Sequence, residues 1–206
     1  MKKLREEENF DQIKLVFDGI FIFAMIWAFG GGLTDSRIQF SGTIKNSAKV
    51  KFPEQGQAYD YFWNIIAGEW QPWSEKVKPY NTEYDGLFSN LVVPTAETTR
   101  QKFLIHMHRK TRKGLLYVGT AGTGKTTIIK DYFNEADPET TVNATMNFNS
   151  YTDSKALQVV IEGSVDKRMG SIFGPPTGKI LIFFMDDLNM PEVDIYFTQE
   201  PICLIR

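Results

Sequence analysis

Apolar and polar residues alternate in short blocks over the second half of the chain, and these blocks predict strands separated by helices. Three apolar runs have the length of strands: 115–118, 142–148 and 180–185. Two stretches show apolar residues at helical spacing: 125–133 and 152–163. Strands that alternate with helices of this length predict a parallel α/β sheet with helices on both faces.

An apolar run near the N-terminus, Gly19–Leu33, predicts a helix that is buried on most sides and ends at the glycines 30–32. Two other interpretations fit the run less well. A membrane-spanning helix needs roughly 20 apolar residues, and Asp18 cuts this run short. A signal peptide is disfavoured because the acidic residues 6–8 stand where a basic leader would continue.

Residues 34–94 show weaker patterns, with dense aromatic side chains and frequent prolines and glycines. We expect an irregular connection with one hairpin, around Phe62–Trp73, and we expect its aromatic side chains to serve packing. A helix should follow, with Thr95 as its N-cap and its end at about Lys113. The basic run 109–113 places cations at the negative end of the helix dipole, which is a commoner role than nucleic-acid binding.

Composition and charge narrow the classes of function. The 206 residues are 42% hydrophobic and 23% charged, as expected for a globular protein. The net charge of −2 gives no overall basic field, so nucleic acid is not an expected partner. The single cysteine, Cys203, cannot form an internal disulfide and is typical of a reducing compartment. His106 and His108 lack the neighbouring ligands that a metal site needs.

A glycine-rich loop between the first predicted strand and the next helix fits the phosphate-binding pattern G-x-x-x-x-G-K-[ST]. We expect all three of its glycines to adopt positive φ and to bring backbone N–H groups close to phosphate oxygens. The N-terminus of the following helix adds unpaired donors, and the lysine would reach the β- and γ-phosphates. The predicted nucleotide-binding residues are Gly119, Thr120, Ala121, Gly122, Thr123, Gly124, Lys125, Thr126 and Thr127.

Two carboxylates end the third predicted strand, at the edge where ligands bind in open α/β sheets. Asp186 is expected to hold the Mg²⁺ ion that the Thr126 hydroxyl also binds. Asp187 stands where many ATPases of this type place a Glu that orients the attacking water. A second Gly-Lys pair, 178–179, precedes a strand instead of a helix and is interpreted as a turn.

Several segments resemble dynein heavy chains. They are the glycine loop, DDLNMPEVDIY at 186–196, WAFGG at 27–31, KFPEQG at 51–56 and LVVPT at 91–95. The resemblance covers nearly the whole chain and corresponds to the end of the second AAA+ module and the N-terminal half of the third. The paired aspartates look more like axonemal heavy chains than cytoplasmic ones, in which this stretch typically carries Asp-Glu.

The resemblance implies a P-loop NTPase (AAA+) fold with an incomplete parallel sheet, of strand order 5-1-4-3-2, preceded by a mainly helical segment. It implies three parts: the helical tail or lid of a preceding module at 1–47, a connecting segment at 48–93 and a partial ATPase core at 94–206. Backbone near Val92–Thr95 would lie against adenine, and Asn189 is a family marker without an assigned catalytic role.

The resemblance also implies a function: binding of ATP with Mg²⁺ in a minus-end-directed microtubule motor of cilia and flagella. The implied partners are other AAA+ modules of the same heavy chain, intermediate and light chains, and microtubules, with no nucleic acid and no membrane. The implied location is the cytoplasm, the cytoskeleton and the axoneme. Two alternatives stay open, namely an AAA+ ATPase of another remodelling class and a purely regulatory nucleotide-binding module.

The chain ends at Arg206, before the fourth and fifth strands, the lid and any arginine finger of the family. We therefore expect a poorly stable chain, because strands beside the fourth one would lack a partner. We also expect slow or no hydrolysis by this chain alone. Asp187 is one methylene shorter than Glu, and a displacement near ~1 Å can lower a rate by ~10²-fold when catalysis depends on position.

Overall fold

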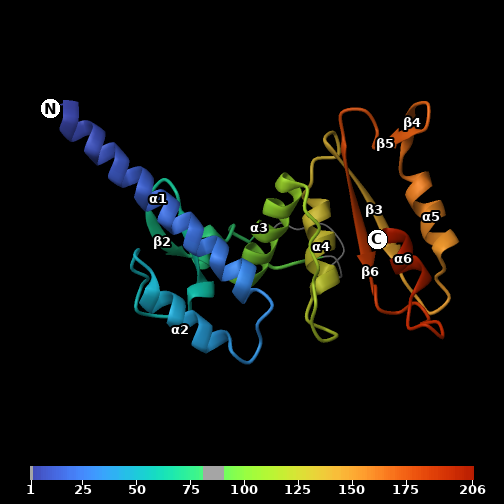
Figure 1. The fold of residues 1–206 in the computed structure, drawn as a ribbon, viewed down its shortest axis with the longest axis horizontal. Helices are drawn as coiled ribbons and strands as arrows, with labels where there is room; N and C mark the ends of the chain where they lie inside the picture. Colours follow the sequence, from blue (N-terminus) through green and yellow to red (C-terminus); the bar gives the residue numbers. More distant parts are fainter. Residues whose placement is uncertain (1, 81–90) are drawn as a thin grey trace. The chain divides into compact units, whose positions relative to one another are not determined.

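The computed structural model of the chain describes residues 2–80 and 91–206, with side chains from residue 10 onward. It divides into two compact units, Met1–Thr111 and Arg112–Arg206. Figure 1 shows the helices and strands of each unit, coloured in chain order. Residues 81–90 of the predicted connecting segment lie outside the described residues.

The first unit is mainly helical. Its elements are α1 (Lys2–Gly30), α2 (Arg37–Ser47), η1 (Ala58–Asp60), β1 (Tyr61–Asn64), β2 (Glu69–Pro72), η2 (Trp73–Lys76) and α3 (Ala96–Thr111). β1 and β2 pair as an antiparallel hairpin, which confirms the hairpin predicted in this segment. Gly68 in its turn has φ +68°, a conformation that glycine adopts without steric cost.

Over its described side chains, residues 10–30, helix α1 is covered on one side only. It ends at Gly30 as predicted, but the expectation that it is buried on most sides is wrong. Its buried residues form one stripe at helical spacing, so one side alone faces the aromatic core. These residues are Gly19, Ile22, Ile26 and Gly30. Large apolar side chains elsewhere on the helix are exposed, among them Phe10, Phe17, Phe21 and Phe29.

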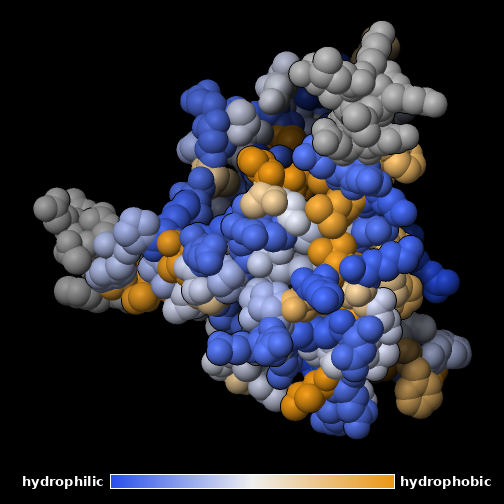
Figure 2. All heavy atoms as spheres, turned by 90° about the vertical axis from the view of Figure 1, so that its left-hand side faces the viewer, coloured by the Kyte–Doolittle hydropathy of each residue, from blue (hydrophilic) through white to orange (hydrophobic). Residues whose placement is uncertain are grey.

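The segment Phe10–Gly30 of α1 is long and apolar enough to cross a membrane, with a mean hydropathy of 1.9. A single helix of this kind near an N-terminus is weak evidence for a membrane span, because core helices and signal sequences have the same properties. Figure 2 shows hydrophobic and hydrophilic side chains mixed over the face that it presents.

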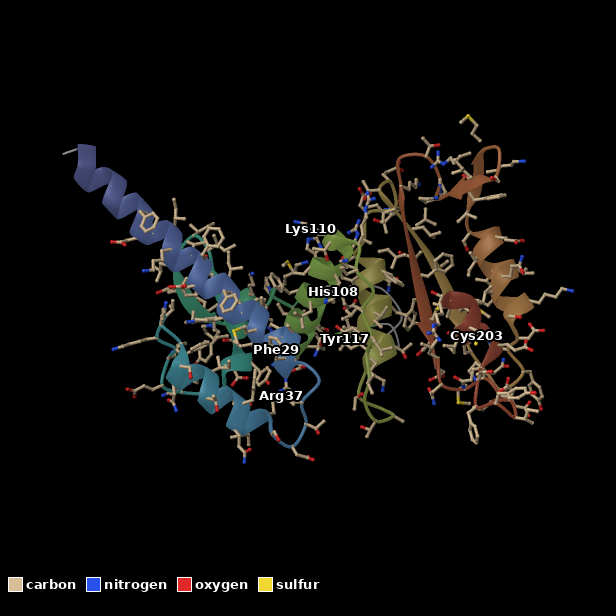
Figure 3. All side chains as sticks on the ribbon, viewed as in Figure 1. Phe29, Arg37, His108, Lys110, Tyr117 and Cys203 are labelled. Atoms are coloured by element: carbon tan, nitrogen blue, oxygen red, sulfur yellow. The ribbon has the colours of Figure 1, made fainter. Side chains whose placement is uncertain are left out.

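Tyr59 lies at the centre of the aromatic core of the first unit and is 1% exposed. Its hydroxyl donates to the carbonyl of Gly30 at 3.0 Å. Its own carbonyl accepts from Trp73 Nε1 at 3.1 Å and from Arg100 Nη1 at 3.3 Å. The guanidinium of Arg37, labelled in Figure 3, lies 4.2 Å from the ring centroid. Burial raises the pKa of Tyr59, and Arg37 opposes that shift. The aromatic residues thus serve packing, as predicted.

Helix α3 begins where the sequence predicts and ends earlier. Thr95 Oγ1 accepts from the backbone N–H of Thr98 at 3.2 Å, as expected of an N-cap. The helix ends at Thr111 rather than at Lys113 because Arg112 adopts φ +53°. A residue in the left-handed conformation cannot continue a right-handed helix.

The second unit is an α/β layer structure. Its elements are α4 (Lys125–Asn134), β3 (Thr141–Asn147), α5 (Ser154–Gly163), β4 (Asp166–Met169), β5 (Ile172–Gly174), β6 (Ile180–Asp186) and α6 (Glu200–Ile205). β3 and β6 pair in parallel, and Figure 1 shows α4 on one face of this sheet and α5 with α6 on the other. The predicted parallel sheet covered on both faces is therefore present.

Two details of the second unit differ from prediction. The antiparallel hairpin of β4 and β5 was not expected from the sequence. The N-cap of α5 is Asp153, whose carboxylate accepts from the Ala156 N–H at 2.7 Å, so the helix begins just after the expected position. Gly178 has φ +79° in the turn before β6, which confirms the predicted turn at the second Gly-Lys pair.

The apolar run Leu115–Val118 is not a strand, contrary to prediction. Val118 is 85% exposed, and among the described residues no strand pairs with this run. Tyr117, labelled in Figure 3, belongs to it. A strand needs a neighbour for its N–H and C=O groups. In the order that the resemblance implies, neither the second nor the third strand adjoins the first, so β3 and β6 cannot serve as that neighbour.

Glycine has a packing role at position 19, and we expect Gly19→Ala to destabilise the first unit. A Cβ there would lie 2.1 Å from Trp63 Cε2, and an indole ring in the core cannot move aside freely. Overpacking of this kind costs about 1–3 kcal/mol, which exceeds or offsets the ~1 kcal/mol gain in helix propensity. The measurement is the free energy of unfolding in urea.

Gly42→Ala in α2 is the matched control. A Cβ at position 42 meets no described atom within 4 Å, so this variant should gain stability from helix propensity alone. Equal gains in both variants would contradict the close approach between α1 and β1.

Candidate functional site

The glycine-rich loop leads directly into α4 and turns sharply at two of its glycines. Gly122 has φ +78° and Gly124 has φ +79°, a region that other residues rarely adopt. The expectation of positive φ is confirmed for these two and is wrong for Gly119. Gly119 precedes the turn, and a Cβ there would make ordinary contacts at 3.7 Å and 3.9 Å. Neither a positive φ nor a steric contact therefore requires glycine at position 119.

The Lys125 ammonium group folds over the loop. Its Nζ donates to the carbonyl oxygens of Gly119 at 2.9 Å and Thr120 at 2.7 Å, and to Thr123 Oγ1 at 3.3 Å. Lys125 is the first residue of α4, where the backbone N–H groups lack partners within the helix. The ammonium charge and the positive end of the helix dipole thus meet at the loop, which suits it to bind an anion.

A hydrogen bond joins α4, the helix after the glycine-rich loop, to the end of β6. Thr126 Oγ1 donates to Asp186 Oδ2 at 2.8 Å, although the two residues are 60 positions apart. Thr126 lies in the first turn of α4, and Asp186 is the last residue of β6. Hydroxyl and carboxylate oxygens are ligands that Mg²⁺ prefers. The structure therefore brings together the two residues predicted to bind the metal, and their oxygens could hold it.

The remaining predicted phosphate-binding residues follow the loop and the first turn of α4. Those that are exposed are Gly119, Thr120, Ala121, Gly122, Thr123 and Thr127. These residues are thus accessible to a ligand. Phe133 on the same helix packs against Phe184 of β6, with ring centroids 6.2 Å apart. This contact fixes the helix, and with it the loop, on one face of the sheet.

Asp187 lies in a turn directly after β6 and is exposed. Its φ is +54°, and its N–H donates to Asp186 Oδ1 at 3.1 Å. Its carbonyl accepts from the N–H of Met190 at 2.9 Å, which closes the turn. The residue predicted to orient water therefore directly follows the carboxylate that meets Thr126, in a backbone conformation that is uncommon for most residues other than glycine.

Asn147 is a polar residue at the same edge that the sequence analysis did not single out. The parallel register sets Asn147 beside Asp186, and Phe148 N–H donates to the Asp186 carbonyl at 3.0 Å. Residues paired in this way project to the same face of a sheet. The sequence did offer a signal: Asn147 is a polar residue near the end of the predicted strand 142–148, just as Asp186 is a polar residue at the end of another.

The loop between β6 and α6 is held by two side chains that sequence analysis also missed. Gln199 Nε2 donates to the carbonyls of Pro191 at 2.7 Å and Asn189 at 3.3 Å. The Asp194 carboxylate accepts from Thr198 Oγ1 at 2.6 Å, from Thr198 N–H at 2.8 Å and from Tyr196 N–H at 2.8 Å. These bonds, those of Thr198 foremost, hold the pKa of Asp194 below its ordinary value of 3.8.

Two family models match the chain. The model of the P-loop containing dynein motor region matches residues 80–206, and that of the dynein heavy chain AAA lid domain matches residues 1–75. The first covers more than half of the chain and includes the glycine-rich loop and both aspartates. A P-loop of this family implies nucleotide binding in general. Helix α1 falls within the lid match.

Curated relatives agree with these matches. The dynein alpha chain of the flagellar outer arm from Chlamydomonas reinhardtii is 42% identical over 200 residues, which cover 93% of this chain and 4% of the relative. The ciliary dynein beta chain of Tripneustes gratilla is 39% identical, and dynein axonemal heavy chain 9 of Homo sapiens is 38% identical. Each of these two alignments covers 94% of this chain and 4% of the relative. The chain thus spans about 4% of the length of the curated relatives it matches.

We expect the loop around Asp194 to open only at a pH below that at which an ordinary aspartate carboxyl becomes protonated. A lowered pKa means that the bonds to Thr198 and Tyr196 contribute fully above the unfolded pKa and are lost as pH falls through the lower, folded pKa. The amide NMR shifts of Tyr196 and Thr198 should titrate with a midpoint below 3.8. In Asp194→Asn this titration should disappear, and a midpoint at or above 3.8 in the unsubstituted chain would contradict the bonding.

Proposed function

Because this chain belongs to the dynein heavy chain family, we propose that it forms an ATP-binding module of an axonemal dynein motor. The names of its relatives, which refer to flagellar outer arms, cilia and axonemes, support this proposal. The complete motor would move towards microtubule minus ends in cilia or flagella. Its partners would be other AAA+ modules of the same heavy chain, intermediate and light chains, and microtubules.

The observation that carries the proposal is the 2.8 Å hydrogen bond between Thr126 and Asp186. It sets a hydroxyl and a carboxylate side by side next to the glycine-rich loop, as a Mg²⁺–nucleotide site requires. We propose that residues 119–127 bind the phosphates of ATP and that Thr126 and Asp186 bind Mg²⁺. When bound, the metal would neutralise charge on the phosphate oxygens. Lys125 would exchange its bonds to loop carbonyls for bonds to phosphate.

The organisation of the chain is proposed to follow that of the family. The three parts are the tail or lid of a preceding module at 1–47, a connecting segment at 48–93 and a partial ATPase core at 94–206.

We propose that this chain alone binds Mg-ATP and hydrolyses it slowly or not at all. Asp187 would orient the attacking water, but its carboxylate is one methylene shorter than that of Glu. Where rate depends on position, a displacement of ~1 Å can lower it by ~10²-fold. The second candidate function is a purely regulatory nucleotide-binding module, which the same short side chain favours.

Nucleotide affinity tests the proposed roles of Lys125 and Thr126. Lys125→Ala should weaken binding of a fluorescent ATP analogue by roughly 10- to 100-fold, since charge-assisted hydrogen bonds contribute about 1.5–3 kcal/mol. Thr126→Val should weaken binding in Mg²⁺ and leave binding in EDTA unchanged. Lys179→Ala, at the second Gly-Lys pair, is the matched control and should bind normally. Tight binding by Lys125→Ala would refute the phosphate-binding role of the loop.

The effect of side-chain length at position 187 on ATP turnover can be measured in the complete heavy chain. Asp187→Glu should raise ATP turnover at this site, because the longer side chain brings the carboxylate closer to the attacking water. Steady-state turnover, with the other nucleotide sites of the ring inactivated, is the measurement. Unchanged turnover would count against the geometric argument and for a regulatory module.

A further inference from the structure

We infer that Gln199 is a positioning residue for the candidate site, and that its carboxamide holds the turn that carries Asp187. The inference rests on the proposed function, because it assigns Gln199 a part in placing the carboxylate proposed to orient water. It concerns a residue 12 positions beyond Asp187 along the chain.

Asp187 needs external support to keep its conformation. Its φ of +54° lies in the left-handed region, which costs most residues with a side chain about 1–2 kcal/mol, and Asp less than most. Such conformations persist where the surrounding structure determines them fully. The local bonds are one from its N–H to Asp186 Oδ1 at 3.1 Å and one from Met190 N–H to its carbonyl at 2.9 Å. Asp187 is exposed, so packing adds little to these two bonds.

Gln199 supplies the missing support. Its carboxamide Nε2 donates to two carbonyls of the loop, at 2.7 Å to that of Pro191 and at 3.3 Å to that of Asn189. Asn189 belongs to the turn that begins at Asp187, and Pro191 is buried directly after it. One side chain therefore bridges the two carbonyls that fix the course of the chain as it leaves the strand.

Gln199 is placed to join α6 to the turn after Asp187, and we call its side chain with these two hydrogen bonds the clamp. It is the residue before α6, and its backbone carbonyl accepts from Cys203 N–H at 3.1 Å, so its main chain is anchored to that helix. Cys203 is labelled on α6 in Figure 3. Within the described residues, the Gln199 side chain accepts no capping bond from α6, and its Nε2 donates to the preceding loop. Helix and turn are thus joined through this side chain.

The turn at Asp194 brings Gln199 back to the loop that follows β6. Asp194 N–H donates to the Thr198 carbonyl at 2.8 Å, and Phe197 N–H donates to the Asp194 carbonyl at 3.0 Å. These bonds reverse the direction of the chain, so that Gln199 lies beside Asn189 and Pro191. Ser154 of α5 donates to Glu200 at 3.4 Å, which ties the returning chain to the helix layer. The clamp is therefore connected to the packed part of the unit.

A lysine elsewhere in the chain shows how the clamp could be rebuilt. Lys45 Nζ donates to three successive carbonyls, of Glu54, Gln55 and Gly56, at 3.0–3.3 Å. An ammonium group can therefore bridge neighbouring carbonyls here as the carboxamide of Gln199 does. Gln199→Lys keeps the donors, whereas Gln199→Met keeps the approximate length and volume of the side chain and removes them.

The test follows the carboxylates of Asp186 and Asp187 separately. Aspartate in the full chain is labelled with ¹³C at the carboxyl carbon, and Mn²⁺–ADP is the paramagnetic probe. In the unsubstituted chain, Mn²⁺ should broaden the signals of both carboxylates. In Gln199→Met the effect on Asp187 should fall several-fold while that on Asp186 is unchanged, and Gln199→Lys should restore it. A purely structural role would reduce both signals together or leave both unchanged.

Gln158→Met on α5 is the matched control. It removes a carboxamide that donates to Glu162 on the exposed side of the same unit, and both carboxylate signals should stay as in the unsubstituted chain. Unchanged broadening of Asp187 in Gln199→Met would overturn the inference. Absence of any effect at Asp186 in the unsubstituted chain would instead overturn the proposed metal–nucleotide site, and the inference with it.

Discussion

The parallel ladder between β3 and β6 is the constraint on which the candidate site depends. It runs in register from Thr141 and Ile180 to Asn147 and Asp186, so both strands end at one edge of the sheet. Only because β6 ends there can Asp186 meet the hydroxyl of Thr126, which α4 carries on the same edge. A shift of register by one residue would turn the carboxylate to the opposite face. The position of Asp186 in the candidate site thus depends on the register of this ladder.

The two carboxylates at this edge are held in different ways. Asp186 is part of the ladder and shares a hydrogen bond with a helix, so its position follows from regular secondary structure. Asp187 lies beyond the ladder in a left-handed conformation, and we propose that Gln199 of the following loop holds its turn. The carboxylate proposed to bind the metal and the one proposed to orient water are therefore held by different kinds of contact although they are neighbours in sequence.

The first unit is organised around a single buried side chain. Tyr59 bonds to the end of α1, and its carbonyl receives donors from η2 and α3. This arrangement satisfies polar groups that would otherwise be costly inside an aromatic core. It also explains why α1 is buried along one stripe only, since the core lies on one side of it. The exposed apolar residues of α1 belong to a segment that matches the dynein AAA lid model.

The sequence by itself determined the loop, the helix after it, the strand that ends in aspartates, and the family. The loop, the helix and the strand follow from local rules: glycines where φ is positive, an apolar run of strand length, and charged residues where it stops. The family follows from the resemblance of several segments to dynein heavy chains. It failed at 115–118, because an apolar run becomes a strand only beside a partner, and partners are a property of the whole fold. The motifs predicted that Thr126 and Asp186 lie near each other, but only the tertiary structure showed the direct hydrogen bond between them and the return of Gln199 to the turn after Asp187. Hydrogen bonds between residues 60 positions apart leave no local pattern, because they depend on the register of strands and on the path of a loop.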